Sequence, residues 1–122
     1  MKSGAPRRGE IVRLNFDPRK GHEQGGFRPA VVVSNSTYND HSSTIVVCPI
    51  TSRVRDWPFI VPLPEDNSVK GAILVDQVRV IDWKARSARQ AGVCPKEVMV
   101  EIDEKLNVLF RGISRLETNG TV

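Results

Sequence analysis

Residues 21–33 read Gly-His-Glu-Gln-Gly-Gly-Phe-Arg-Pro-Ala-Val-Val-Val and combine two halves of opposite character. The first half, residues 21–26, holds three glycines and three polar side chains; we call it the flap, because glycine restricts the backbone little. The second half, 30–33, is a valine-rich apolar run that predicts a buried strand. Pro29 disfavours helical geometry for the preceding Arg28. The stretch therefore predicts a guanidinium fixed at the mouth of a rigid strand, beneath a mobile loop.

A cation in that position suits the binding of a phosphate that must enter, react and leave. The alternative is a plain β-hairpin loop with a solvated arginine. Composition does not decide between them, because a net charge of +4 permits an anionic partner without requiring one.

The 122 residues are enough for one domain with a real hydrophobic core, and 39% apolar with 26% charged residues is typical of a soluble globular protein. No apolar run approaches the roughly 20 residues that span a bilayer, so no membrane association is expected. The start, Met1 to Arg8, is basic without an apolar stretch behind it, so we expect no secretion signal and a cytoplasmic protein. Cys48 and Cys94 are then expected to be reduced. No His or Cys cluster has metal-ligand spacing, and no metal site is expected.

The chain order predicts a mainly β fold of the α+β kind, with five to seven short strands and one late helix. Strands are expected at 9–16, 28–34, 43–48 (ending at Pro49), 59–63, 71–75 and 76–83, with a short helical turn at 35–40. The proline within 59–63 places that strand at a sheet edge. These strands predict a small, strongly bent β-barrel or two packed sheets.

Residues 95–113 change period and predict a helix with one apolar stripe. The stripe is either a core face or a subunit contact, and it comprises Val98, Ile102, Leu106, Leu109 and Ile113. Pro95 suits the first helical position and Gly112 the helix end. We therefore expect one domain over 9–114, a flexible arm over 1–8 and a flexible tail over 115–122.

The sequence has no Ser-His-Asp elbow, no nucleotide-binding phosphate loop and no dinucleotide fingerprint. RNA relaxes the need for such apparatus, because its own 2′-hydroxyl can attack the adjacent phosphate. The protein must then remove the 2′ proton, stabilise charge on phosphorus and protonate the leaving 5′-oxygen. Arg28 fits the second task, since a guanidinium forks onto two phosphate oxygens. Thr51 offers a hydroxyl at a strand end, and Glu23 can accept or relay a proton.

The sequence also resembles a known family. Residues 21–34, the strand end Cys48-Pro49-Ile50-Thr51 and the segment Asp76-Gln77-Val78-Arg79 are similar to the motifs of the MazF/PemK (Kid) toxin endoribonucleases. The resemblance extends from about Gly9 to Ile113. It implies a compact SH3-like barrel of the CcdB/MazF type, a homodimer, and cleavage of single-stranded RNA at short sequences without metal or cofactor. It further implies 2′,3′-cyclic phosphate and 5′-hydroxyl ends, and a cognate antitoxin with a disordered acidic tail.

Residue by residue, the family's catalytic arginine falls on Arg28 and its threonine on Thr51. Its flap glutamate and glutamine fall on Glu23 and Gln24. The resemblance places further RNA contacts at Phe16, Lys20, Gln77 and Arg79. His22 is a departure, because many members have serine there; it is a candidate for RNA contact or proton exchange.

Each candidate has a plainer interpretation. Phe16 and Phe27 stack bases, worth roughly 1–3 kcal/mol each, or belong to the core. Arg53 and the nearby Arg55 steer the RNA backbone, or are solvated loop residues. In the same way Arg28 can form a structural salt bridge, Thr51 can satisfy strand-end backbone groups and Glu23 can stabilise the flap. The general base is left unassigned, because arginine holds its proton far above neutral pH.

Two other functions stay open at this stage. One is a non-catalytic poison of the same barrel class, such as a CcdB-like inhibitor of DNA gyrase, and the other is a plain RNA-binding barrel. The flap and the Arg28-Pro29 pair favour the nuclease, because a gyrase poison needs no phosphate clamp there.

Overall fold

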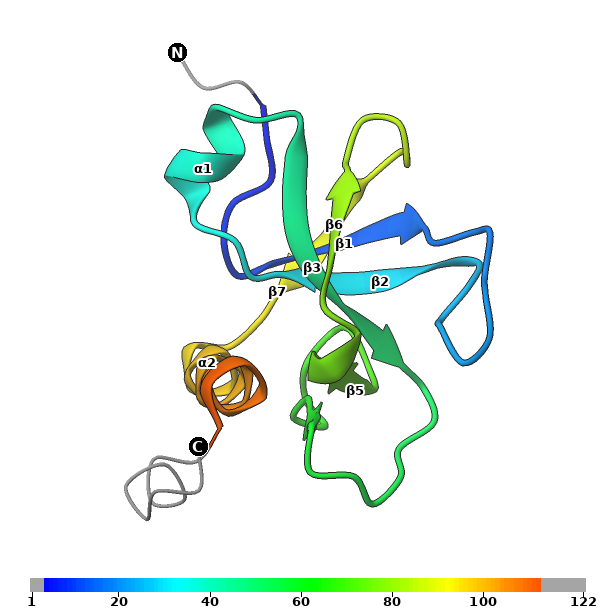
Figure 1. The fold of residues 1–122 in the computed structure, drawn as a ribbon, viewed down its shortest axis with the longest axis vertical. Coiled ribbons are helices and arrows are strands. Elements are labelled where there is room, and N and C mark those ends of the chain that lie inside the picture. Colours follow the sequence, from blue (N-terminus) through cyan, green and yellow to red (C-terminus); the bar gives the residue numbers. More distant parts are fainter. Residues whose placement is uncertain (1–3, 113–122) are drawn as a thin grey trace.

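The structure, a computed structural model, describes residues 4–112 and is shown in Figure 1. Seven strands, two α-helices and one 3-10 helix follow one another along this part of the chain. The strands are β1 (Glu10–Asn15), β2 (Phe27–Val32), β3 (Thr44–Thr51), β4 (Ile60–Pro62), β5 (Ala72–Leu74), β6 (Arg79–Asp82) and β7 (Arg89–Val93). The helices are α1 (Ser36–Asp40), η1 (Val75–Gln77) and α2 (Lys96–Arg111).

All strand pairs are antiparallel, in the order β4-β5-β3-β2-β1-β7, with β6 also paired to β3. The expected mainly β fold with a C-terminal helix is confirmed, at the upper limit of the predicted strand number. Within residues 4–112 the sheet curls strongly but does not close into a barrel, because β4 and β7 end the order without pairing to each other. β4, which contains Pro62, lies at one edge of the sheet, and this confirms the edge position predicted from its proline.

β3 is the central strand of the sheet and pairs with three other strands. Along one side it pairs with β2, and along the other it pairs first with β6 (residues 44–47) and then with β5 (residues 50–51). The prediction that this strand ends at Pro49 was wrong, since β3 continues to Thr51. Pro49 lies between the residues of β3 that pair with β6 and those that pair with β5. Its missing N–H therefore removes no hydrogen bond to either of these strands. The extension carries Thr51 to the end of a rigid strand.

β1 has apolar side chains on both faces, which joins two core clusters. Ile11 packs into the larger cluster, which includes α2, whereas Val12, Leu14 and Phe16 pack into the second with β2, β3 and β6. All four of these side chains are at most 2% exposed. The central strands are therefore anchored from both sides, and the loops at their ends are held by a stiff framework.

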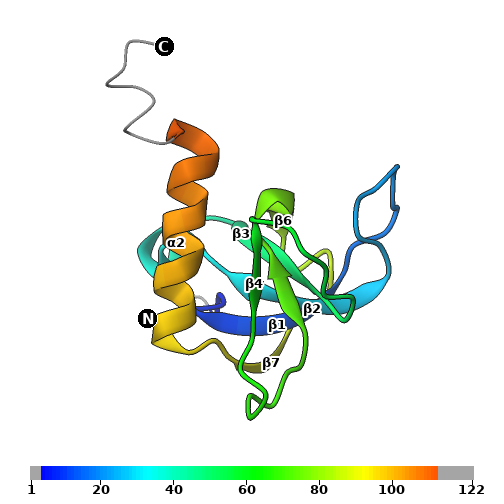
Figure 2. The ribbon, with the colours of Figure 1, turned by 90° about the horizontal axis from the view of Figure 1, so that it is seen from below.

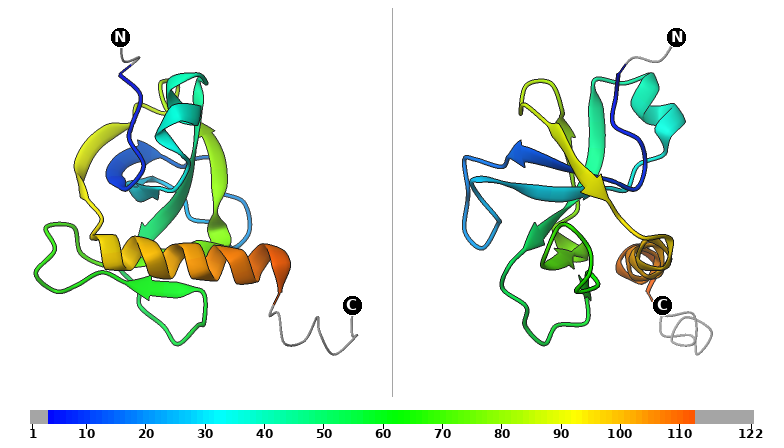
Figure 3. Two further views of the ribbon diagram at one scale, coloured as in Figure 1. Left: turned by 90° about the vertical axis from the view of Figure 1, so that its left-hand side faces the viewer. Right: turned by 180° about the vertical axis from the view of Figure 1, so that it is seen from behind.

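α2 lies beside the sheet, on the side away from the β1–β2 loop (Figures 2 and 3). Val98 and Ile102 are buried in the larger core, which confirms the predicted core face for the first half of the helix. In the second half Leu106 still packs against this core, whereas Leu109 is 37% exposed, so the stripe leaves the core between these two residues. Ile113 falls outside the described residues. The helix ends at Gly112, whose φ of 78° suits glycine.

Two elements differ from the predictions. Residues 75–77 form the 3-10 helix η1 rather than the start of a strand at 76. β7 was not anticipated, because Arg-Gln-Ala-Gly-Val has weak strand propensity; it forms by pairing with β1 across a register shift.

Part of the expected N-terminal arm is docked. Ala5 is buried, Arg7 Nη1 lies 2.6 Å from Asp40 Oδ1, and Arg8 Nη2 lies 2.6 Å from Asp103 Oδ2. These contacts tie residues 5–8 to α1 and α2. No helix within residues 4–112 is long and apolar enough to cross a membrane.

Candidate active site

A polar cleft of about 490 Å³ opens where β2 begins and β3 ends. One wall is the β1–β2 loop with the flap, and the other is the start of the β3–β4 loop, residues 52–59. Figure 1 shows the β1–β2 loop projecting on the side of the sheet away from α2, and the β3–β4 loop curving below the sheet from the end of β3. The lining residues are Asp17, Arg19, His22, Glu23, Gln24, Gly25, Gly26, Arg28, Thr51, Ser52 and Arg53.

Arg28 enters the cleft from the second position of β2, where its backbone pairs with Leu14. The side chain is half-buried, and its Nε donates a hydrogen bond to the carbonyl oxygen of Gly25 at 2.7 Å. Its two terminal nitrogens, Nη1 and Nη2, have no hydrogen bond or ion pair within residues 4–112. The Nε bond therefore orients a guanidinium whose terminal nitrogens are available to an anion.

Thr51 ends β3 opposite Ala72 of β5 and is 5% exposed. Its Oγ1 accepts a hydrogen bond from the backbone N–H of Arg53 at 3.1 Å. This is the strand-end role that the sequence offered as the plainer interpretation. The bond uses the oxygen as an acceptor and leaves the hydroxyl proton to donate elsewhere.

The base of the flap is held by one backbone–backbone bond and one bond to a side chain. Phe16 N–H donates to Gly26 O at 2.9 Å, and Gly26 N–H donates to Asp17 Oδ1 at 2.7 Å. Gly25 lies against Arg19 so closely that a Cβ atom would come within 2.6 Å of Arg19 Cβ. Glycine is therefore required at position 25 by close approach rather than by flexibility.

The outer part of the flap is hydrogen-bonded to Gln77 of η1, the connection between β5 and β6. Gln24 N–H donates to Gln77 Oε1 at 3.0 Å, and Gln77 Nε2 donates to His22 O at 3.4 Å. The side chains of His22 and Glu23 are exposed, and both line the cleft. The flap thus presents an imidazole and a carboxylate beside Arg28 and Thr51.

Two further hollows adjoin this cleft, and we call the three together the groove. One, of about 640 Å³, shares Arg19, His22, Gln24, Thr51 and Arg53 with it; the other, of about 330 Å³, shares Glu23 and Gln24. Together they are lined by five arginines and three acidic residues: Arg19, Arg28, Arg53, Arg55, Arg79, Asp17, Glu23 and Asp76. The excess of guanidinium groups favours an anionic polymer over a neutral ligand.

Comparison with known proteins agrees with this geometry. A family model described as PemK-like, MazF-like toxin of type II toxin–antitoxin system matches residues 7–110. The chain is 39% identical over 105 residues to the endoribonuclease toxin MazF of Escherichia coli K12, a match covering 86% of this chain and 94% of that protein. The chain belongs to the PemK/MazF toxin family.

Solved structures of the family have the same fold. MazF from Deinococcus radiodurans aligns with a TM-score of 0.82 at 43% identity, covering 87% of this chain and 96% of that one. The MazE–MazF complex from the same organism aligns at 0.78 and 43% identity over the same shares of each chain.

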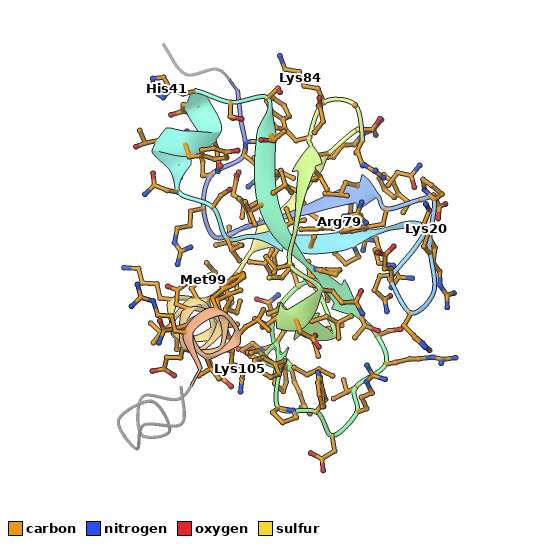
Figure 4. The ribbon with its side chains drawn as sticks, in the orientation of Figure 1. Lys20, His41, Arg79, Lys84, Met99 and Lys105 are labelled. Atoms are coloured by element: carbon orange, nitrogen blue, oxygen red, sulfur yellow. The ribbon has the colours of Figure 1, made fainter. Side chains whose placement is uncertain are left out.

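In this PemK/MazF chain the groove brings together most of the residues that the sequence singled out. The cleft holds Arg28, Thr51, Glu23, His22, Gln24 and Arg53, and the adjoining hollows add Gln77 and Arg79. Lys20 lies at the outer end of the β1–β2 loop, away from the body of the sheet (Figure 4), and is not among the lining residues. Phe27 is 54% exposed and also lies outside these linings.

Phe16 lines the hollow of about 330 Å³ from the core side. The side chain is 0% exposed and belongs to the core, as the plainer interpretation held. The Arg79 guanidinium carbon lies 5.5 Å from the centre of its ring. Phe16 therefore supports the Arg79 guanidinium by a cation–π contact.

Sequence reasoning missed Asp17, Arg19 and Asp76 as parts of the site. For Asp17 a local signal exists, because a short carboxylate readily accepts from nearby backbone N–H groups, as it does from Gly26. Asp76 accepts from Trp57 Nε1 at 2.9 Å, a contact between residues 19 apart that no local pattern signals.

Cys48 and Cys94 are buried free thiols outside the groove. Burial raises the pKa of each to about 12, with smaller contributions from the charges of Asp76 and Glu97 respectively. Both therefore stay protonated and unreactive at neutral pH. Among residues 4–112 no group of three His, Cys, Asp or Glu side chains is placed to hold a metal ion.

Proposed function

We propose that this chain is a toxin endoribonuclease of a type II toxin–antitoxin system and cleaves single-stranded RNA in the groove. The observation that carries the proposal is the pairing of two groups in one cleft: the unbonded end of the Arg28 guanidinium and the free donor of the Thr51 hydroxyl. Both are donors that line the cleft with the flap residues, which supports the binding of a phosphate there. Named relatives are endoribonuclease toxins, which supports the same reaction.

The reaction is a transesterification within the RNA. The 2′-oxygen loses its proton and bonds to the adjacent phosphorus, the bond from phosphorus to the 5′-oxygen breaks, and that oxygen takes up a proton. The products carry a 2′,3′-cyclic phosphate and a 5′-hydroxyl. The nucleophile comes from the substrate, so the protein supplies charge stabilisation and proton transfer and no metal or cofactor is required.

Arg28 in this proposal stabilises the phosphorane, because its two terminal nitrogens fork onto two phosphate oxygens. Thr51 donates its hydroxyl proton to the same oxygens. Glu23 and His22 are the groups in the flap that can accept or deliver protons, since both are exposed in the cleft. Arg53, Gln24, Gln77 and Arg79 line the path of the flanking nucleotides.

The proposed protein partner is a cognate antitoxin, as in the MazE–MazF complex. The proposal gives it a disordered acidic tail, which the arginine-rich groove suits by charge. A homodimer is proposed as well, because the second half of α2 leaves Val108, Leu109 and Phe110 exposed. Light scattering of the purified chain tests the homodimer, because it measures the mass of the particle in solution.

The test is cleavage of single-stranded RNA by purified protein in the presence of EDTA. We expect fragments with cyclic-phosphate and 5′-hydroxyl ends. An oligonucleotide with 2′-deoxyribose at the cleaved position serves as the control, because it lacks the nucleophile. Equal cleavage of the deoxy control, or intact RNA across varied sequences, contradicts the proposal; inhibition of DNA gyrase by the same sample then identifies a CcdB-like poison.

A further inference from the structure

The two loops that wall the cleft are held by neighbouring residues of one short element. Gln77 of η1 bonds the flap at Gln24 N–H and His22 O. The preceding residue, Asp76, bonds the β3–β4 loop through Trp57 Nε1. These loops are more than 25 residues apart in the sequence, and η1 connects them in space.

η1 itself is fixed to the core. Val75 is 0% exposed, its N–H donates to Phe59 O at 2.9 Å, and its carbonyl accepts from Val78 N–H at 3.3 Å. The element lies between β5 and β6, which both pair with β3, and it also packs against α2 (Figure 1). A side chain on η1 is therefore attached to the buried, hydrogen-bonded part of the molecule, where local opening is least favourable.

Gln77 is bonded to the flap at both ends of its amide, which leaves one N–H and one oxygen lone pair. The oxygen accepts from the flap, and the nitrogen donates back to the flap, so both ends of the amide serve the protein. Asp76 is engaged on the other loop, where the Trp57 ring packs on Phe59 with 5.9 Å between ring centres. Each wall is thus bonded to one side chain of η1, the flap to Gln77 and the β3–β4 loop to Asp76.

We propose that η1 is the common anchor that sets the spacing between the two walls of the cleft. Gln77 is a positioning residue for the flap, and Asp76 with Trp57 is the positioning pair for the β3–β4 loop. The anchor holds Glu23 and His22 on one wall at a fixed distance from Arg28, Thr51 and Arg53. The inference rests on the proposed function for its effect on RNA cleavage, but the tethers themselves belong to the free protein.

Hydrogen exchange of the RNA-free protein tests the flap tether. In Gln77→Leu the amide of Gln24 loses its acceptor, and we expect its exchange to speed up on the order of tenfold. Gln77→Glu keeps an acceptor oxygen in place and should restore slow exchange at Gln24. Gln90→Leu is the matched control, because Gln90 is exposed on β7 and does not line the groove.

Trp57→Phe tests the second tether, because it keeps an aromatic ring beside Phe59 and removes the indole N–H that donates to Asp76. We expect faster exchange across residues 52–57 with little change in the flap. In RNA cleavage both Gln77→Leu and Trp57→Phe should lower kcat several-fold and change KM less, since a displaced wall misplaces reacting groups rather than removing a contact.

Unchanged exchange at Gln24 in Gln77→Leu overturns the anchor. So does a result in which that variant keeps slow flap exchange but alters which base is cleaved, because Gln77 would then contact RNA directly. Failure of the wild-type protein to cleave any RNA would count against the proposed function alone, since the exchange results are obtained without substrate.

Discussion

The backbone of Gly71 lies against the carbonyl of Thr51, so that a Cβ atom on Gly71 would come within 2.4 Å of that oxygen. Gly71 also has a φ of 125°, which side chains rarely adopt. The start of β5 is thereby pressed onto the end of β3, where Thr51 pairs with Ala72. The position of the Thr51 hydroxyl thus depends on a missing side chain twenty residues away.

Gly71→Ala is therefore expected to lower both stability and activity. The backbone strain and the clash together should reduce the free energy of unfolding by about 2–4 kcal/mol, measured by urea denaturation. Gly4→Ala is the control, since Gly4 has a φ of 83° but open space around its missing Cβ. Equal losses in the two variants would show that the contact with Thr51 contributes nothing.

Arg28→Ala should abolish most RNA cleavage while leaving the fold intact. Removing a preorganised donor to a developing oxyanion typically lowers kcat by about 10²–10³-fold. The only hydrogen bond lost among the described residues is the one to Gly25 O, so the melting temperature should change little. Arg28→Lys keeps the charge without the fork and should restore only a small part of the rate.

The control for Arg28 is Arg89→Ala, which removes an exposed arginine on β7. It tests whether net charge alone explains the loss. If both variants slow cleavage equally, Arg28 acts as one of many surface cations and the proposed clamp is wrong.

Thr51 is best tested with a pair of substitutions. Thr51→Val preserves shape but removes the donor, and it leaves Arg53 N–H without its acceptor. We expect kcat to fall by about 10- to 100-fold and stability by about 1 kcal/mol. Thr51→Ser keeps the hydroxyl and should retain most activity. A Val variant as active as wild type would assign Thr51 to strand-end capping alone.

Gly25→Ala is expected to displace the flap without unfolding the protein. The new methyl group would lie within 2.6 Å of Arg19 Cβ and 3.0 Å of Asp17 Oδ1, so the loop must move. The flap is peripheral to both core clusters, and the free energy of unfolding should change by less than about 1 kcal/mol. RNA cleavage should fall, whereas Gly21→Ala, which meets no atom within 4 Å, should have a smaller effect.

The sequence predicted those parts of the fold and site that depend on local pattern. Alternating and continuous apolar runs located β1, β2 and the first half of α2, and the Arg28-Pro29 junction located the cleft, because these signals lie within a few residues. The extension of β3 through Pro49, the strand β7 and the 3-10 helix η1 depend on partners far along the chain. The engagement of Gln77 with the flap was invisible for the same reason, since 53 residues separate Gln77 from Gln24.

The two buried thiols predict a loss of stability in alkali. Each has a native pKa of about 12, raised from an ordinary value of 9.0 mainly by burial. The native state therefore keeps its protons where the unfolded chain loses them. Stability from this source is complete below pH 9 and falls as pH rises toward 12, by up to about 1.4 kcal/mol per pH unit for each thiol.

Urea denaturation at pH 8 and pH 10 measures this slope. The informative quantity is the difference between the wild type and a Cys48→Ala/Cys94→Ala variant, because it isolates the two thiols from every other group of the chain. The double variant should be less stable at pH 8, because each change leaves a small cavity, but it should lose less stability between the two pH values. Identical slopes would mean that neither thiol contributes, so that both ionise as readily in the folded protein as in the unfolded chain.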